Sequence, residues 1–218
     1  MYMRFVCCAI LLSLCTPGFA QDDDMPDFRS KRDNLLKMQE KDLQADIATF
    51  TMAGIDISNA RPPIASVPVQ DFGDDFLTFD SGSIRVTIKS APFTVGKHKM
   101  QYVDKYLVRI DMKPYFGSYS KVPKKYIQTI NVVVDGDTVA IPAAAYADLY
   151  EPGLTYAGKG GESRSLAGVY YSGNKQSPYR TVYIYLLCND GMGGYEVTWV
   201  IQDKKYLRRV VDAGILKN

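Results

Sequence analysis

The clearest structural signal in this sequence is the run VYIYLLCNDGMGGYEVTWVIQDKKYLRRVV at residues 182–211. Apolar residues alternate along three segments of this run, which is the period-two pattern of strands with one face buried. In the first segment, Val182, Ile184 and Leu186 share one face, and Tyr183 and Tyr185 lie on the other. Turn residues separate the segments, so the run predicts an antiparallel meander of three strands.

The same alternation continues towards the N-terminus. It predicts further strands at residues 76–79, 84–88, 106–112, 127–134, 138–141 and 167–171. Asp135-Gly136 separates two of them and tolerates the positive φ angles of a tight hairpin, while residues 142–150 favour a short helix or turn. The expected fold is mainly β, at most α+β: an antiparallel sheet, sandwich or open barrel of about eight or nine strands.

The first 20 residues have the pattern of a secretory signal peptide. A short segment ending in Arg4 precedes an apolar run from Phe5 to Leu14, and small residues lead to a cleavage site after Ala20. The mature chain is therefore expected to be periplasmic or secreted. Acylation at Cys15 is the alternative, although Leu14 stands where a lipobox prefers a small residue. No apolar run reaches the length of a membrane-spanning helix, so no stable membrane insertion is expected.

Residues 21–68 are expected to precede the β domain, which we place at 69–218. An acidic lead-in is followed by an amphipathic helix at residues 31–52 and by a stiff Pro-rich linker at 59–68. The apolar stripe of the helix must be buried against the same chain or a partner. It consists of Leu36, Leu43, Ile47 and Phe50.

Charge and cysteine content exclude several classes of function. The 218 residues carry 26 Lys and Arg against 24 Asp and Glu, a net charge of +2 that predicts no broad nucleic-acid-binding face. Without the signal peptide only Cys188 and His98 remain of their types. An internal disulfide is then impossible, and zinc sites built from Cys and His are excluded. We therefore expect neither a metal nor a cofactor.

Few residues suggest catalysis. Cys188 shares the apolar face of a predicted strand, where a free thiol acts as a small hydrophobic residue. His98 lies between two lysines, as a solvated residue would. Asp148 and Glu151, among tyrosines, are the carboxylates best suited to act on a sugar, together with Glu196. We expect the first two to cap or solvate a turn instead, and we assign no catalytic residue.

Tyrosine provides the main clue to binding. The chain has 16 tyrosines, and all except Tyr2 come after residue 100. Ordinary sheet packing explains most of them, but some tyrosines, with nearby cations, would form an exposed recognition surface. The predicted binding residues are Tyr183, Tyr185, Arg180, Arg208, Asp148 and Glu151, with Lys121, Lys124, Lys125 and Arg209 as further cations.

Two segments resemble parts of small exported bacterial β-rich proteins, some of which are similar to immunity or inhibitor proteins. They are Ile141-Pro142 with residues 146–152, and Asn189-Asp190-Gly191 with residues 195–199. The resemblance implies a non-catalytic protein that binds an envelope or secreted protein. The alternatives are a carbohydrate-binding or carbohydrate-acting protein, and a structural envelope protein that docks through its helix.

Overall fold

The computed structural model describes most of the chain from Ile64 onward. The continuous parts are 64–154, 166–172, 180–188 and 193–213, and the separate positions are 39, 41, 44, 47, 50, 51, 54, 55, 156, 157, 163 and 164. The signal-peptide prediction and most of the predicted N-terminal helix lie outside these residues. Lys41, Gln44 and Ile47 have helical backbone, whereas β1 (Phe50–Thr51) pairs with β2 (Gly54–Ile55), so the helix ends before Phe50.

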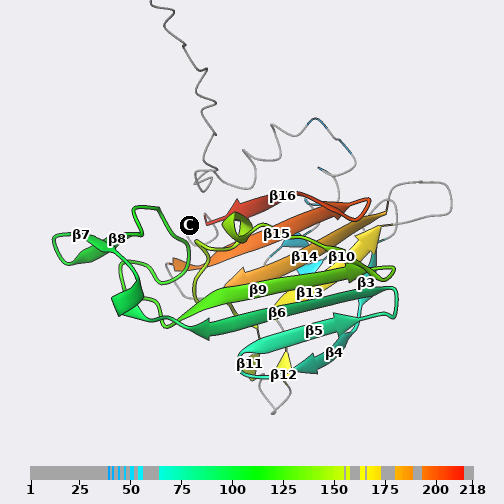
Figure 1. The fold of residues 1–218 in the computed structure, drawn as a ribbon, viewed down its shortest axis with the longest axis horizontal. Coiled ribbons are helices and arrows are strands. Elements are labelled where there is room, and N and C mark those ends of the chain that lie inside the picture. Colours follow the sequence, from blue (N-terminus) through cyan, green and yellow to red (C-terminus); the bar gives the residue numbers. More distant parts are fainter. Residues whose placement is uncertain are drawn as a thin grey trace, which may run out of the picture.

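Two five-stranded antiparallel sheets form the body of the protein (Figure 1). The first has the order β10-β9-β6-β5-β4, and the second has the order β16-β15-β14-β13-β3. The predicted mainly β, antiparallel fold is confirmed. The strands of the first sheet are β4 (Val69–Phe72), β5 (Phe76–Asp80), β6 (Ile84–Pro92), β9 (Lys125–Val134) and β10 (Asp137–Val139). Those of the second are β3 (Ile64–Val67), β13 (Ala167–Ser172), β14 (Thr181–Cys188), β15 (Tyr195–Gln202) and β16 (Lys205–Asp212).

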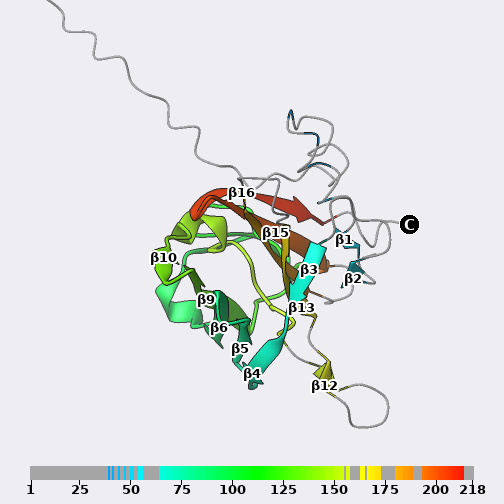
Figure 2. The same ribbon diagram turned by 90° about the vertical axis from the view of Figure 1, so that its right-hand side faces the viewer.

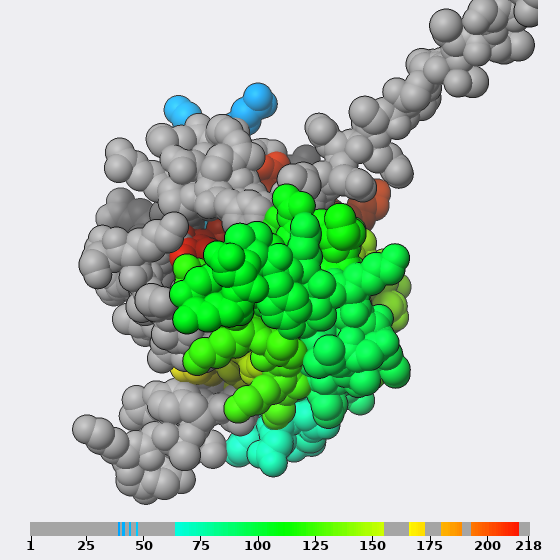
Figure 3. Space-filling view, turned by 90° about the vertical axis from the view of Figure 1, so that its left-hand side faces the viewer, coloured from blue at the N-terminus to red at the C-terminus, as the bar shows by residue number. Residues whose placement is uncertain are grey.

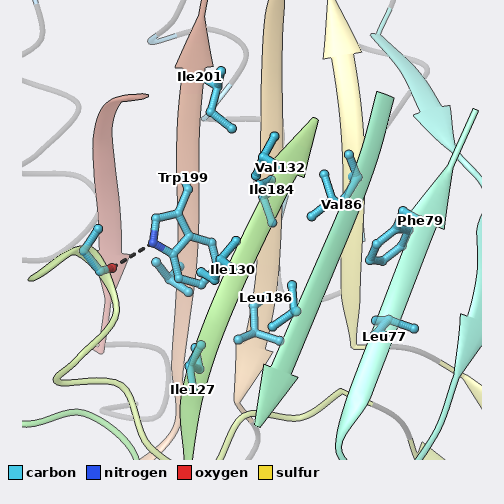
Figure 4. Close-up of a cluster of buried hydrophobic side chains, with 14 of the residues drawn as sticks. Leu77, Phe79, Val86, Ile127, Ile130, Val132, Ile184, Leu186, Trp199 and Ile201 are labelled. Atoms are coloured by element: carbon cyan, nitrogen blue, oxygen red, sulfur yellow. Dashed lines mark hydrogen bonds between the residues drawn. The ribbon is translucent and has the colours of Figure 1, made fainter. Parts of the chain in front are cut away.

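The core lies between the two sheets because each contributes one alternating apolar face to it. Val86 of β6 and Ile130 of β9 point into this core from one side, and Ile184 and Leu186 of β14 from the other (Figure 4). Trp199 is fully buried beside them. Its Nε1 donates a hydrogen bond of 2.8 Å to the carbonyl oxygen of Ala145, so the indole nitrogen is paired within the core (Figure 4).

The two sheets are joined at one side by β3 and β4, which belong to different sheets but are separated by Pro68 alone. Figure 2 shows the chain passing from one sheet to the other there. Pro68 has no N–H to donate, and its carbonyl oxygen accepts a hydrogen bond from Asp80. The predicted linker at 59–68 is therefore wrong for Ile64–Val67, which form an edge strand. These two strands raise the number in the main sheets to ten.

Tight turns set the register of two hairpins. Asp135 and Gly136 have φ angles of 50° and 83° between β9 and β10, as the predicted hairpin requires. Asp203 and Lys204 adopt φ angles of 50° and 61° between β15 and β16. The expected turn at 142–150 contains the short 3₁₀ helix η2 (Ala143–Ala145).

A smaller hairpin projects from the end of the first sheet (Figure 1). It consists of β7 (Met100–Val103) and β8 (Tyr106–Ile110), preceded by the 3₁₀ helix η1 (Val95–Lys97). A third two-stranded pairing joins β11 (Tyr156–Ala157) and β12 (Ser163–Arg164). Across the described residues, no helix is long and apolar enough to cross a membrane.

Candidate binding surface

The two tyrosines predicted to form a recognition surface are buried. Tyr183 and Tyr185 do face away from the main core, as the alternation predicts, but they are only 0% and 5% exposed. They pack in a second apolar cluster with Ile47. The Tyr185 hydroxyl donates a hydrogen bond of 3.1 Å to Glu196, and burial together with this carboxylate raises the pKa of Tyr185. An exposed role for these two side chains is therefore wrong.

Arg180 occupies the end of the body opposite the projecting hairpin. Its guanidinium donates to both carboxylate oxygens of Asp135, at 2.9 and 3.1 Å, and to the hydroxyl of Ser83 at 3.0 Å. It also lies 5.2 Å from the centre of the Tyr171 ring. A cavity of about 320 Å³ adjoins it, and its lining includes the buried Val182 and Ile201. Arg208 is half-buried on β16, opposite Val200 of β15.

Asp148 and Glu151 lie in the segment after η2, and both make contacts that stabilise the fold. Asp148 forms a two-point ion pair with Arg209, at 2.5 and 2.7 Å, and both side chains are largely buried. The Glu151 carboxylate accepts a hydrogen bond from the backbone N–H of Lys124. Glu196 lies on the face of the second sheet that points away from the main core, where its carboxylate accepts the hydrogen bond from Tyr185. Each of these three carboxylates is therefore engaged by another group of the protein, and Glu196 is separated from the other two by the second sheet.

Cys188 and His98, the residues that could have suggested thiol or metal chemistry, both make contacts that serve the fold. Cys188 is 1% exposed in the main core, as predicted for a small hydrophobic residue. His98 contacts a carboxylate in the projecting hairpin, far along the chain from Cys188. Within the described ranges, no group of three or more His, Cys, Asp or Glu side chains is placed to hold a metal ion.

The structure shows an exposed apolar surface on residues 93–125, which we call the arm. Of the eleven large apolar side chains exposed in the described residues, eight belong to it. Val103 and Tyr106 pair directly across the hairpin and are 58% and 48% exposed. The others are Val95, Tyr102, Val108, Met112, Tyr119 and Val122. In Figure 3 the arm forms a continuous green surface facing the viewer.

Aromatic packing fixes the arm to the body. Leu107 and Ile110 form a small cluster with Tyr150, which lies in the loop after η2. The Tyr150 ring meets Phe93 and Tyr115 edge to face, with ring centres 5.5 and 5.8 Å apart. Burial raises the pKa of Tyr150. The arm therefore has its own small core, which includes Tyr150 from the loop after η2, and its Phe116 also packs in the main core.

Polar contacts brace the base of the arm. His98 Nδ1 lies 2.7 Å from one oxygen of Asp111, and the backbone N–H of Lys99 donates to the other oxygen at 2.8 Å. The His98 ring stacks on Phe93 at 4.5 Å. Partial burial alone would raise the pKa of Asp111, but the hydrogen bonds from His98 and Lys99 outweigh it, and this pKa lies below its ordinary value.

Within the arm, the Tyr115 hydroxyl ties the segment that follows β8 back to β8 itself. It lies 3.2 Å from the carbonyl oxygen of Leu107 and 3.1 Å from that of Ser118, and it donates to this pair of acceptors. Burial raises the pKa of Tyr115 to about 12. The hydroxyl therefore remains a donor at all physiological pH values, and the exposed surface is presented on a braced framework.

Comparisons with protein-family models, with curated proteins and with solved structures find no match for this chain.

Proposed function

We propose that this protein is an exported, non-catalytic binding protein and that a protein partner docks on the arm. The observation that carries the proposal is the concentration of exposed apolar side chains on one braced projection. Soluble proteins rarely expose a contiguous apolar patch without using it in an interaction. Tyrosine and methionine are enriched at interfaces, where their large side chains fill pockets in the partner.

The class of partner follows from the expected export and from the resemblance to inhibitor and immunity proteins. Such a protein neutralises a toxin or a hydrolase in the envelope or outside the cell. A projecting hairpin suits this role because it can enter a concave site on the partner. Its small aromatic core fixes its shape before binding and so reduces the entropy lost on association.

Carbohydrate binding is the second candidate, and the exposed rings of Tyr102, Tyr106 and Tyr119 favour it. Aromatic rings provide flat apolar faces with a polar edge, which suit a sugar ring. The aliphatic side chains beside them favour a protein surface instead. Because Arg209 and the backbone of Lys124 engage the carboxylates of Asp148 and Glu151, a carbohydrate role would be one of binding and not of hydrolysis.

The test is a comparison of two variants of the full-length mature chain in affinity isolation from envelope and secreted fractions. Val103→Ser/Tyr106→Ser removes the exposed apolar pair and should lose a partner that the unaltered chain retains. Phe72→Ser is the matched control, because Phe72 is 51% exposed on β4, outside the arm. Equal recovery of every partner by both variants would refute docking on the arm.

A further inference from the structure

We infer that the arm recognises an acidic protein surface, a step that rests on the proposed protein-binding function. The first observation is a segregation of charge along the chain. Residues 93–125 include eight Lys and Arg but only two Asp, a net charge of +6 with His98 neutral. Because the whole chain carries +2, all the other residues together carry −4. The small net charge of the whole sequence is therefore the sum of a basic arm and an acidic set of other residues.

The positive charges of the arm are not neutralised internally. In the described part of the chain, none of the eight basic side chains forms an ion pair; Lys125 donates to the backbone carbonyl of Asp74. One of the two acidic side chains, Asp111, is engaged by His98 and by the backbone of Lys99. The basic side chains are exposed except for the half-buried Lys125; they are Lys97, Lys99, Lys105, Arg109, Lys113, Lys121 and Lys124.

Charged and apolar groups alternate closely on this surface. Lys105 lies between the exposed Val103 and Tyr106, and its Nζ is 5.5 Å from the centre of the Tyr106 ring. Lys121 likewise adjoins the exposed Val122. The complement of the arm is a surface on which apolar side chains and carboxylates are likewise interspersed. The carboxylates steer the two proteins together and select the correct partner.

The mixture of side chains favours a protein over other anionic partners. Val95, Val103, Val108 and Val122 gain little from stacked sugars or bases, but they bury well against another protein's apolar side chains. A membrane is disfavoured because Asp104 and Lys105 form the turn of the hairpin, so the two charges at its tip cancel. Attraction to anionic head groups requires clustered basic side chains at the point of contact.

The test measures fluorescence anisotropy of labelled probes titrated with the full-length mature chain. The main probe is a random copolypeptide of glutamate and tyrosine, which presents carboxylates and apolar groups together. Polyglutamate, polygalacturonate and phosphatidylglycerol vesicles represent charge alone, an anionic glycan and a membrane. We expect the copolypeptide to bind most tightly, and its affinity to fall about tenfold between 50 and 500 mM NaCl because salt screens exposed charges.

Charge-reversal variants locate the binding site. Lys105→Glu/Lys121→Glu should weaken copolypeptide binding about tenfold or more. Lys89→Glu/Lys205→Glu changes the net charge equally at exposed positions outside the arm and should stay within about twofold of the unaltered chain. Equal weakening by both variants, or tighter binding of polygalacturonate or vesicles, would overturn the assignment of an acidic protein partner.

Failure of this inference can be separated from failure of the proposed function by the affinity isolation. A partner lost by Val103→Ser/Tyr106→Ser but retained by Lys105→Glu/Lys121→Glu would leave docking on the arm intact and refute its acidic complement. A partner retained by both variants would refute both. A partner lost with both variants, together with salt-dependent binding of the copolypeptide, is the result that supports the inference.

Discussion

Asp148 and Arg209 illustrate how an apparent functional pair serves stability. Their two hydrogen bonds join the loop after η2 to β16, and their side chains are only 10% and 13% exposed. Removing one member leaves the other charge buried without its partner. We therefore expect Asp148→Ala to lower the free energy of unfolding by about 3 kcal/mol.

Urea denaturation of the variants measures this cost. Asp137→Ala is the matched control, because it breaks an ion pair with Lys204 whose side chains are 67% and 40% exposed. The control should cost much less, since water screens exposed pairs. Equal losses for the two variants would show that the Asp148–Arg209 pair is no more important than a surface contact.

Asp111 gives the arm a defined response to acid. Its folded-state pKa is lowered, so its contribution to stability is fully present above the ordinary value of 3.8 and is lost as the pH falls through the lower, folded value. Asp111→Asn should therefore be less stable than the unaltered chain at pH 5–7, and this difference should shrink below about pH 4. Unfolding curves measured between pH 6 and pH 2 test this, and a constant difference would contradict it.

At the scale of elements, the arm depends on the ring of Tyr150. This ring packs against Leu107 and Ile110 and meets two aromatic rings edge to face. Tyr150→Ala should cost about 3 kcal/mol, and trypsin should cleave the arm faster at its lysines because the arm unfolds locally. Leu77→Ala is the control, because Leu77 is fully buried in the main core and should destabilise the chain without selective cleavage of the arm. Equal cleavage of the arm in both variants would exclude this role for Tyr150.

The contrast between β14 and β8 shows how far the sequence could predict the fold. In β14, alternation identified the two faces correctly, because Val182, Ile184 and Leu186 all lie in the main core. In the predicted strand at 106–112, the same period misled, because Tyr106 and Val108 are exposed on a hairpin outside the two sheets. Period two identifies a strand, but burial of a face depends on which sheet covers it. β3 was missed because prolines flank it.

The candidate site was predictable in composition but not in position. The sequence indicated tyrosines with nearby cations, and the arm has both, including Lys121, Lys124 and Lys125. The prediction that Tyr183 and Tyr185 are exposed was wrong, because alternation identifies the two faces of a strand but does not say whether another part of the chain covers the second face. The signal that could have identified the arm is the concentration of lysines at 97–125, which the near-zero net charge obscured.

At the scale of the whole molecule, β14 and β15 of the second sheet are buried on both faces of that sheet. Its inner face contributes to the main core, while Tyr183, Val200 and Val210 on the outer face pack with Ile47. Ile47 is 0% exposed and comes from the chain before β3. An N-terminal residue therefore completes the packing of the C-terminal meander, which explains why tyrosines that the pattern places outside the main core are not accessible.

This packing makes Ile47 a sensitive test of the whole arrangement. Ile47→Ala should lower the free energy of unfolding by about 2–4 kcal/mol through the cavity that it leaves. Ile47→Asp should cost more, because it buries a charge against Tyr183 and Val200 without a partner. Lys41→Asp is the control, since Lys41 is exposed with the same helical backbone.

Chemical denaturation gives the free energies of unfolding of these variants. Accessibility of Tyr183 to a small nitrating reagent should rise only in the Ile47 variants. If Ile47→Asp were as stable as Lys41→Asp, the outer face would not need this residue, and Tyr183 and Tyr185 would again be candidates for recognition.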